Sequence, residues 1–264
     1  MTVGIVGAGV MGETLLAGLL RAGMSPDELL VAERRPERAA ELTDKYSVRV
    51  VDNATVAKEA STLVLLVKPQ DMANTLAEIA PTLHKDALVI SVAAGITTEF
   101  MEHNLPAGTR VVRSMPNTPA LVDQAMVALC PGSKCTPEDL KVAEQLLSSV
   151  GKVLEVPERY MDAVTAISGS GPAYIYYVAE AMIEAGVMLG MPRDLATEMV
   201  YQTVFGAATM LNETRLHPTV LREQVTSPGG TTVAALRVFD DFKVRAAFLS
   251  AMEAARDRSR ELGS

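Results

Sequence analysis

The feature that most constrains this chain is a set of three glycines between a strand-like run and a helix-like run. Near the start, the residues VGIV are followed by a Gly-X-Gly-X-X-Gly spacing and then by the apolar pattern ETLLAGLL. Here the first glycine permits a tight turn, the second lets a pyrophosphate approach the backbone, and the third allows close helix–strand packing. Glycines that serve only a structural turn are the alternative, but this context favours a dinucleotide-binding turn. The expected contact residues are Gly7, Ala8, Gly9, Val10, Met11 and Gly12.

Short β-rich runs alternate with helical patterns over the first part of the chain. Helix-like segments such as PERAAELTDKY and DMANTLAEIAPTL separate many of these runs. Near-continuous apolar strands separated by helices are typical of a mostly parallel sheet that is covered on both faces. The runs dominated by Val, Leu and Ile predict strands at 3–7, 29–33, 48–51, 62–67, 87–92, 109–114, 125–130 and 152–156.

The pattern changes after Pro157, because only helical spacing follows. Apolar residues recur at helical positions from Ile175 onward, and further helices are expected at 192–213 and 241–262. Pro192 is well placed near the first turn of the helix expected at 192–213. The sequence therefore predicts a Rossmann-like, doubly wound α/β domain over 1–158, followed by an all-helical domain over 159–264.

Composition excludes several classes of protein. The net charge of −8 argues against a nucleic-acid partner. The most apolar helix-like segment contains Glu180 and Glu184, which would be costly inside a bilayer, and the first residues lack the basic flank of a signal peptide. We therefore expect a cytoplasmic protein with no membrane partner.

Metal binding and histidine catalysis are not expected. Cys130 and Cys135 have the spacing of half a metal site, but no Cys or His cluster completes it, so incidental thiols are the better interpretation. No histidine shares a motif with an acid or a nucleophile. The three incidental histidines are His84, His103 and His217.

The end of the second expected strand bears on the choice of dinucleotide. Glu33 occupies the usual place of the acid that binds a ribose 2′-hydroxyl, which favours NADH. Arg34 and Arg35 follow directly, and arginine suits the bidentate recognition of a 2′-phosphate. A solvated cluster of loop charges is the third interpretation. We expect NADPH, with NADH as the alternative.

Four further stretches carry a specific resemblance. They are LLVKPQ at 65–70, VRSMPNTPALV at 112–122, DAVTAISGSGPAYIY at 162–176 and TSPGGTT at 226–232. Together and in this order they resemble the pyrroline-5-carboxylate reductase family, whose members reduce 1-pyrroline-5-carboxylate to L-proline with NAD(P)H in the last step of proline biosynthesis. The resemblance extends from the first residues to the last expected helix, and TSPGGTT is its most specific part.

The resemblance implies further cofactor contacts. Asn53 would contact the adenosine side, Val67, Lys68 and Pro69 the nicotinamide side, and Asn117 would hold the nicotinamide region. Each has a structural alternative: Asn53 could cap a helix, and Lys68 could be an ordinary charge at a helix start. Ala93 and Ala94 would line the same groove, unless they are simple core residues.

TSPGGTT is the expected substrate site. Its glycines expose backbone N–H groups, and its hydroxyls add donors, so the turn suits a carboxylate without any arginine. Thr232 is the expected catalytic residue, because its hydroxyl could hydrogen-bond the imine nitrogen and orient it. A glycine-rich turn with an N-cap is the structural alternative. The expected substrate contacts are Ser227, Gly229, Gly230, Thr231, Thr232 and, by its position in the family, Glu158, for which an exposed helix-start charge is the alternative.

Assembly and two rival functions complete these expectations. The apolar helical domain should bury surface against another subunit, and the resemblance implies a homodimer, with larger rings of dimers in some members. A 3-hydroxyacid dehydrogenase or imine reductase is one rival, but DAVTAISGSGPAY lacks the interdomain lysine typical of the hydroxyacid enzymes. A regulatory protein that binds NADPH without turnover is the other.

Overall fold

The computed structural model describes residues 1–263. Over this range the chain divides into two structural units. The first unit contains residues 1–170 together with the end of the chain from Ala254, and the second contains residues 171–253.

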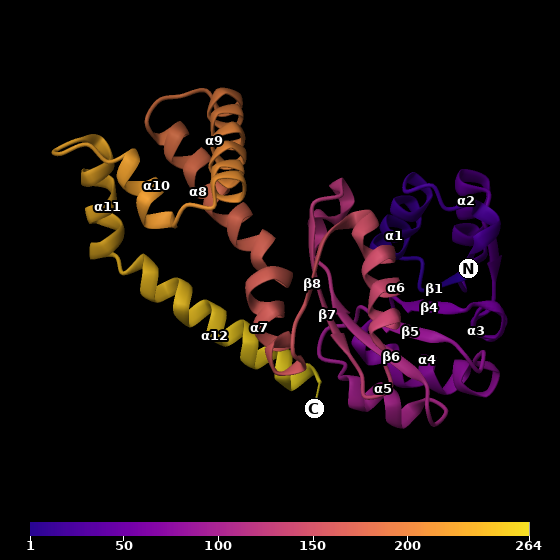
Figure 1. Cartoon of the computed structure of the whole chain (residues 1–264). Coiled ribbons are helices and arrows are strands. Elements are labelled where there is room, and N and C mark those ends of the chain that lie inside the picture. The colour runs from indigo at the N-terminus through magenta and orange to yellow at the C-terminus, as the bar shows by residue number, and fades with distance from the viewer. Residues whose placement is uncertain (264) are drawn as a thin grey trace. The chain divides into compact units, whose positions relative to one another are not determined.

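The first unit is built on one eight-stranded sheet (Figure 1). Its strand order is β3-β2-β1-β4-β5-β6-β7-β8, and every neighbouring pair is parallel except β6 with β7. All eight expected strands are present, which confirms the Rossmann-like prediction. Their bounds are β1 Val3–Val6, β2 Leu29–Ala32, β3 Arg49–Val51, β4 Thr62–Leu65, β5 Leu88–Ser91, β6 Arg110–Met115, β7 Ala125–Pro131 and β8 Gly151–Glu155.

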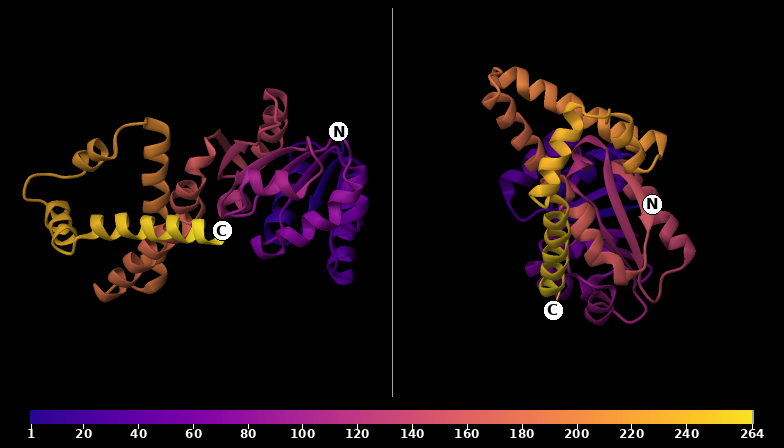
Figure 2. Two further views of the ribbon diagram at one scale, coloured as in Figure 1. Left: turned by 90° about the horizontal axis from the view of Figure 1, so that it is seen from below. Right: turned by 90° about the vertical axis from the view of Figure 1, so that its left-hand side faces the viewer.

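Helices cover both faces of this sheet (Figure 2). Successive strand residues point to opposite faces, so Ile5 joins one apolar cluster and Val6 the other. The cluster containing Ile5 includes residues of α1, α2 and α6, and the cluster containing Val6 includes residues of α3, α4 and α5. The helices of the unit are α1 Val10–Arg21, α2 Pro36–Tyr46, α3 Asn53–Glu59, α4 Met72–Ile79, α5 Thr98–Asn104, α6 Pro137–Leu147 and α7 Met161–Val164.

A buried arginine joins the sheet to the segments that follow it. Arg113 of β6 is only 4% exposed, and its guanidinium lies 3.2 Å from the Glu158 carboxylate and 3.7 Å from that of Asp162. Asp162 in turn accepts a hydrogen bond of 2.9 Å from Ser259, near the end of the chain. These contacts explain why the first unit continues to Ser170, past the boundary expected at 158/159, and why it includes the end of the chain. The division of functions between the two parts remains a prediction.

The second unit is helical throughout. The helix expected at 192–213 is α9, and Pro192 lies one position before it, as its N-cap. The helix expected at 241–262 is α12, which begins at Val244 and whose last residues belong to the first unit. The bounds are α8 Gly171–Met188, α9 Arg193–Thr214, α10 Pro218–Gln224, α11 Thr231–Asp241 and α12 Val244–Leu262.

The helices of the second unit bury few of their apolar side chains. Within residues 171–253, the buried hydrophobic residues are Ala179, Ala196 and Val200 alone. By contrast, Tyr177 is 75% exposed and Phe242 79% exposed. An apolar surface of this kind marks an interaction face rather than a solvated one. Among the described residues, no helix is both long enough and apolar enough to span a membrane.

Glu13 connects the helix after the glycine turn to the next helix. Its carboxylate accepts hydrogen bonds of 2.8 Å from Lys45 and 2.8 Å from Tyr46 of α2, and it also pairs with Arg38. Hydrogen bonds from Lys45, which has the larger effect, and from Arg38 lower the pKa of Glu13 from 4.5 to about 2. The charged carboxylate therefore stabilises the fold above pH 4.5, and this contribution is lost as the pH falls from 4.5 towards about 2.

We expect Glu13→Gln to lower the free energy of unfolding at neutral pH, with a deficit that shrinks as the solution is acidified. Urea unfolding of both proteins from about pH 7 to about pH 3 measures this difference. Glu37→Gln, at an exposed position of α2, is the matched control and should show a smaller deficit. A Glu13→Gln deficit that stays constant over the whole range would contradict the prediction.

Candidate functional site

The glycine turn has the backbone form that close approach of a dinucleotide requires. Gly7 has a φ of +99°, a left-handed conformation that favours glycine. A Cβ on Gly12 would lie 2.0 Å from the Gly7 carbonyl oxygen, so no side chain fits between α1 and the turn. A Cβ on Gly9 would meet nothing within 4 Å, which leaves its outer face open. Gly9 is also the N-cap of α1, and no side chain caps the helix, so its first N–H groups are available to phosphate oxygens.

The sheet topology gathers the expected cofactor residues at one edge. Strands β1 to β6 pair in parallel, so their carboxyl ends meet on the same side. The order reverses at β1, which lies between β2 and β4, and this switch point is where open α/β sheets bind ligands. The expected residues that follow these strands are Gly7 after β1, Arg34 and Arg35 after β2, Asn53 after β3, Val67 to Pro69 after β4, Ala93 and Ala94 after β5, and Asn117 after β6.

Two adjoining cavities lie at this edge. One of about 280 Å³ includes Gly7, Arg34, Asn53 and Val67 in its lining, and thus brings four expected contact residues together. The other, of about 350 Å³, shares Glu33, Arg34 and Asn53 with it. Sequence analysis did not single out the remaining polar lining residues, which are Asp52, Asp71, Asn74, Thr75 and Glu78.

Glu33 and Arg35, which lie two residues apart at the end of β2, form an ion pair with each other. The Glu33 side chain is only 8% exposed and accepts three hydrogen bonds from Arg35, at 2.9 Å from its backbone N–H and 3.0 and 3.1 Å from its guanidinium. These hydrogen bonds hold the pKa of Glu33 below its usual value. The buried carboxylate is therefore charged and neutralised by its neighbour, while the Arg35 side chain remains 68% exposed.

Glu78 contacts two of the expected cofactor residues. Its carboxylate lies 2.5 Å from the Arg34 guanidinium and accepts a hydrogen bond of 2.9 Å from the Asn53 amide. Asn53 is the first residue of α3, and Asp52 is the N-cap, accepting a hydrogen bond of 2.7 Å from the Thr55 N–H. The interpretation of Asn53 as a helix cap is therefore wrong, and its side chain faces Glu78 instead.

The remaining expected cofactor residues differ in how free their side chains are. Lys68 is exposed and precedes a 3₁₀ turn over Pro69–Asp71. Ala93 is buried and Ala94 half-buried. The Asn117 amide is engaged internally, accepting from the Met126 N–H at 2.9 Å and donating to the Ser168 carbonyl at 3.1 Å.

Glu158 begins the 3₁₀ turn over Glu158–Tyr160, and its side chain is half-buried rather than exposed. Its carboxylate accepts hydrogen bonds from the Thr98 N–H, at 2.8 Å, and from the Thr98 hydroxyl, and it pairs with the buried Arg113. The structural alternative for this residue is therefore right about its position at a helix start and wrong about its exposure. Arg113 was the signal available in the sequence, because an arginine within the run VVRSM, directly after two apolar strand residues, implies a buried partner.

The TSPGGTT segment lies in the second unit and forms a tight turn into a helix. Gly229 has a φ of +67°, and the Gly230 N–H donates to the Ser227 carbonyl at 3.0 Å. Gly230 is the N-cap of α11, Thr231 and Thr232 are its first two residues, and no side chain caps it. The turn thus presents backbone donors beside the half-buried Thr232 and the exposed Ser227 and Thr231.

The two cysteine thiols contribute to the packing of the protein. Both cysteines are free, and burial raises the pKa of Cys130 to about 12. The Cys135 thiol donates to the Val111 carbonyl at 2.9 Å. Over residues 1–263, no cluster of three His, Cys, Asp or Glu side chains is placed to hold a metal ion.

Known proteins resemble this chain over its whole length. Residues 158–262 match the family model for pyrroline-5-carboxylate reductase dimerisation, and residues 2–95 match the model for coenzyme F420-dependent NADP oxidoreductases. Pyrroline-5-carboxylate reductase from Corynebacterium melassecola is 46% identical, with 99% of this chain and 98% of that protein covered. The enzyme of the same name from Methanosarcina acetivorans is 43% identical over 99% of this chain and 97% of its own length.

Solved structures agree with the sequence relatives. A pyrroline-5-carboxylate reductase from Coxiella burnetii superposes with a TM-score of 0.93 at 35% identity, covering 100% of this chain and 98% of that one. The Plasmodium falciparum pyrroline carboxylate reductase with NADP bound gives a TM-score of 0.91 at 29% identity and the same coverage. The resemblance drawn from the four sequence stretches is thereby confirmed. This chain belongs to the pyrroline-5-carboxylate reductase family.

Proposed function

We propose that this protein reduces 1-pyrroline-5-carboxylate to L-proline with NADPH in the cytoplasm, as a homodimer. The observation that carries the cofactor half of the proposal is the convergence of the glycine turn, Arg34, Asn53 and Val67 on one cavity at the switch point of the sheet. Two free cysteines suit a reducing compartment. The assay that tests the function is NADPH oxidation that depends on added pyrroline-5-carboxylate; binding without turnover would indicate the regulatory alternative.

The dinucleotide fits the described residues. The open face of Gly9 and the uncapped start of α1 suit a pyrophosphate, and Val67, Lys68, Pro69, Ala93, Ala94 and Asn117 would surround the nicotinamide side. The bound dihydronicotinamide supplies the hydride that saturates the C=N bond. The protein has to align substrate with cofactor and exclude water, because a protonated imine is already electrophilic.

NADPH is preferred over NADH on the strength of two exposed arginines. The Arg34–Glu78 pair is exposed on both sides, and surface pairs of this kind stabilise a protein by only about 0–1 kcal/mol, so Arg34 can turn towards a 2′-phosphate at small cost. Arg35 would keep its pair with the buried Glu33 carboxylate and reach the phosphate with the N–H groups of its guanidinium that Glu33 does not use. A hydrogen bond to a charged group contributes about 1.5–3 kcal/mol, so the exchange favours binding. The NADP in the Plasmodium falciparum structure is in keeping with this preference.

The substrate carboxylate would bind the TSPGGTT turn. The N–H groups of Gly229 and Gly230 and the positive end of α11 suit an anion, and Ser227 and Thr231 add hydroxyls. The Thr232 hydroxyl would donate a hydrogen bond to the ring nitrogen, whose lone pair forms as the protonated C=N bond accepts the hydride. Glu158 stays a predicted substrate contact, with Thr98 and Arg113 fixing its carboxylate.

The homodimer would be formed by the helical second unit. Its exposed apolar side chains and the match of residues 158–262 to a dimerisation model support this assignment. Sedimentation of the purified chain measures the assembly, and a ring of dimers would give a larger even multiple of the protomer mass.

Replacing both Arg34 and Arg35 with alanine should weaken NADPH binding by about 1–3 kcal/mol, because charged hydrogen bonds to the 2′-phosphate are lost. NADH affinity should change little. Titration of each cofactor by calorimetry measures the difference. Arg49→Ala, which removes an exposed arginine paired with Glu59, is the control and should affect neither cofactor. Equal loss for NADH and NADPH would refute the assignment.

Thr232→Val keeps the shape and β-branching of the side chain but removes its hydroxyl. We expect kcat/KM to fall by about 1–3 kcal/mol, roughly ten- to a hundred-fold. NADPH affinity should not change, and the melting temperature should shift little because no side chain caps α11. Thr203→Val, at an exposed position of α9 outside the proposed substrate site, is the matched control. Full activity combined with a clear loss of stability would mean that Thr232 is structural, leaving Ser227 or Thr231 as the contact.

A further inference from the structure

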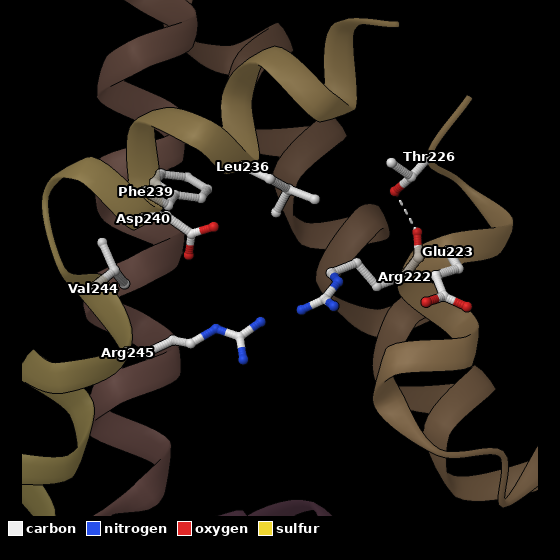
Figure 3. Close-up of a pocket in the computed structure, with 8 residues that line it drawn as sticks. All are labelled: Arg222, Glu223, Thr226, Leu236, Phe239, Asp240, Val244 and Arg245. Atoms are coloured by element: carbon white, nitrogen blue, oxygen red, sulfur yellow. Dashed lines mark hydrogen bonds between the residues drawn. The ribbon is translucent and has the colours of Figure 1, made fainter. Parts of the chain in front are cut away.

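Two arginines of the second unit point into one cavity. The cavity of about 340 Å³ lies between α10, α11 and α12 and is lined by Arg222, Glu223, Thr226, Leu236, Phe239, Asp240, Val244 and Arg245. Figure 3 shows the guanidinium groups of Arg222 and Arg245 facing one another across it. Neither guanidinium has an ionic or hydrogen-bonded partner within residues 1–263, and the Glu223 and Asp240 carboxylates lie outside the space between them. Two like charges in this arrangement repel each other unless an anion lies between them.

A second face of the same unit carries two unpaired acids. It is a hollow of about 610 Å³ between α8 and α9, where Glu180 and Glu184 lie one helical turn apart on α8. Both carboxylates lack a partner among the described residues. Tyr176, Tyr177 and Tyr201 surround them and are 63%, 75% and 61% exposed. One cation, Arg193, also lines the hollow but forms no ion pair with either carboxylate, so covering this apolar face favours a partner that brings cations of its own.

The two faces are complementary in charge and in polarity. The arginine cavity combines Arg222 and Arg245 with the apolar side chains of Leu236, Phe239 and Val244, while its acids Glu223 and Asp240 lie outside the space between the two guanidinium groups. The α8 hollow combines Glu180 and Glu184 with tyrosines and contains one cation, Arg193, in its lining. The acids are spaced i, i+4, so they can reach two neighbouring guanidinium groups from one helix face. Because the charges do not pair within the chain, a second copy is the partner that offers both faces.

We propose that Arg222 and Arg245 bind Glu180 and Glu184 of the partner subunit, and that this contact occurs twice in the dimer. A two-fold axis makes an interface reciprocal, so each copy contributes its arginine cavity to one contact and its acidic α8 face to the other. The inference rests on the proposed homodimer. It adds a defined set of ion pairs that fixes how the helical units face each other.

The test uses two charge-reversed full-length chains. One carries Arg222→Glu and Arg245→Glu, and the other carries Glu180→Arg and Glu184→Arg. Each homodimer would place like charges together in both contacts, so each chain alone should have a dimer dissociation constant at least about a hundred-fold above wild type. A mixture restores opposite charges in both contacts, so the two chains should form a heterodimer with nearly wild-type affinity.

Sedimentation equilibrium measures the masses, and circular dichroism establishes that each chain is folded. Glu198→Arg with Glu213→Arg, at two exposed positions of α9, matches the charge change of the second chain and should stay dimeric. Charge-reversed chains that dimerise like this control overturn the ion pairs while leaving the dimer intact. Monomeric chains that fail to associate when mixed also overturn the pairing. A monomeric wild-type protein would instead overturn the proposed assembly itself.

Discussion

The direction of the first six strands determines where everything else in the first unit lies. Parallel pairing from β3 across to β6 places the ends of these strands at one edge, and each end continues into a segment that carries expected cofactor residues. A single antiparallel strand in this set would move its residues to the opposite edge. The reversal of strand order at β1 then opens the cavity in which Gly7, Arg34, Asn53 and Val67 meet.

Charge inside the first unit is used to hold distant segments together. Arg113 is nearly inaccessible to solvent, and a buried cation is tolerated only when it is paired. Its partners Glu158 and Asp162 follow the last strand, and Asp162 also contacts Ser259 and Arg260. Because an unpaired Arg113 would be costly, its ion pairs hold the segment after β8 against the sheet. Through Asp162 they also hold the last turns of α12 in place. Breaking one partner would leave an uncompensated charge in the interior.

The second unit differs from the first because its helices bury too few apolar side chains to form a sufficient core of their own. Small residues such as Ala179 and Ala196 are buried while tyrosines and phenylalanines are exposed. An apolar surface of this kind favours association, which stabilises a helical unit by burying apolar area. The TSPGGTT turn is located in this unit, so the proposed substrate site depends on the same association for its order.

The sequence by itself determined the eight strands, the glycine turn and the family, because these depend on local spacing and on short contiguous motifs. It also placed the expected cofactor residues directly after strands, whose carboxyl ends lie together when the strands pair in parallel. The structure shows that β7 runs antiparallel to β6, a direction that the strand predictions did not assign; the physical reason is the short segment between Met115 and Ala125, which leaves no room for the crossover that a parallel β7 would need. It also decided the partners of Arg34, Asn53 and Glu158, because Glu78, Thr98 and Arg113 lie far from them along the chain and become neighbours only when the sheet and its helices pack.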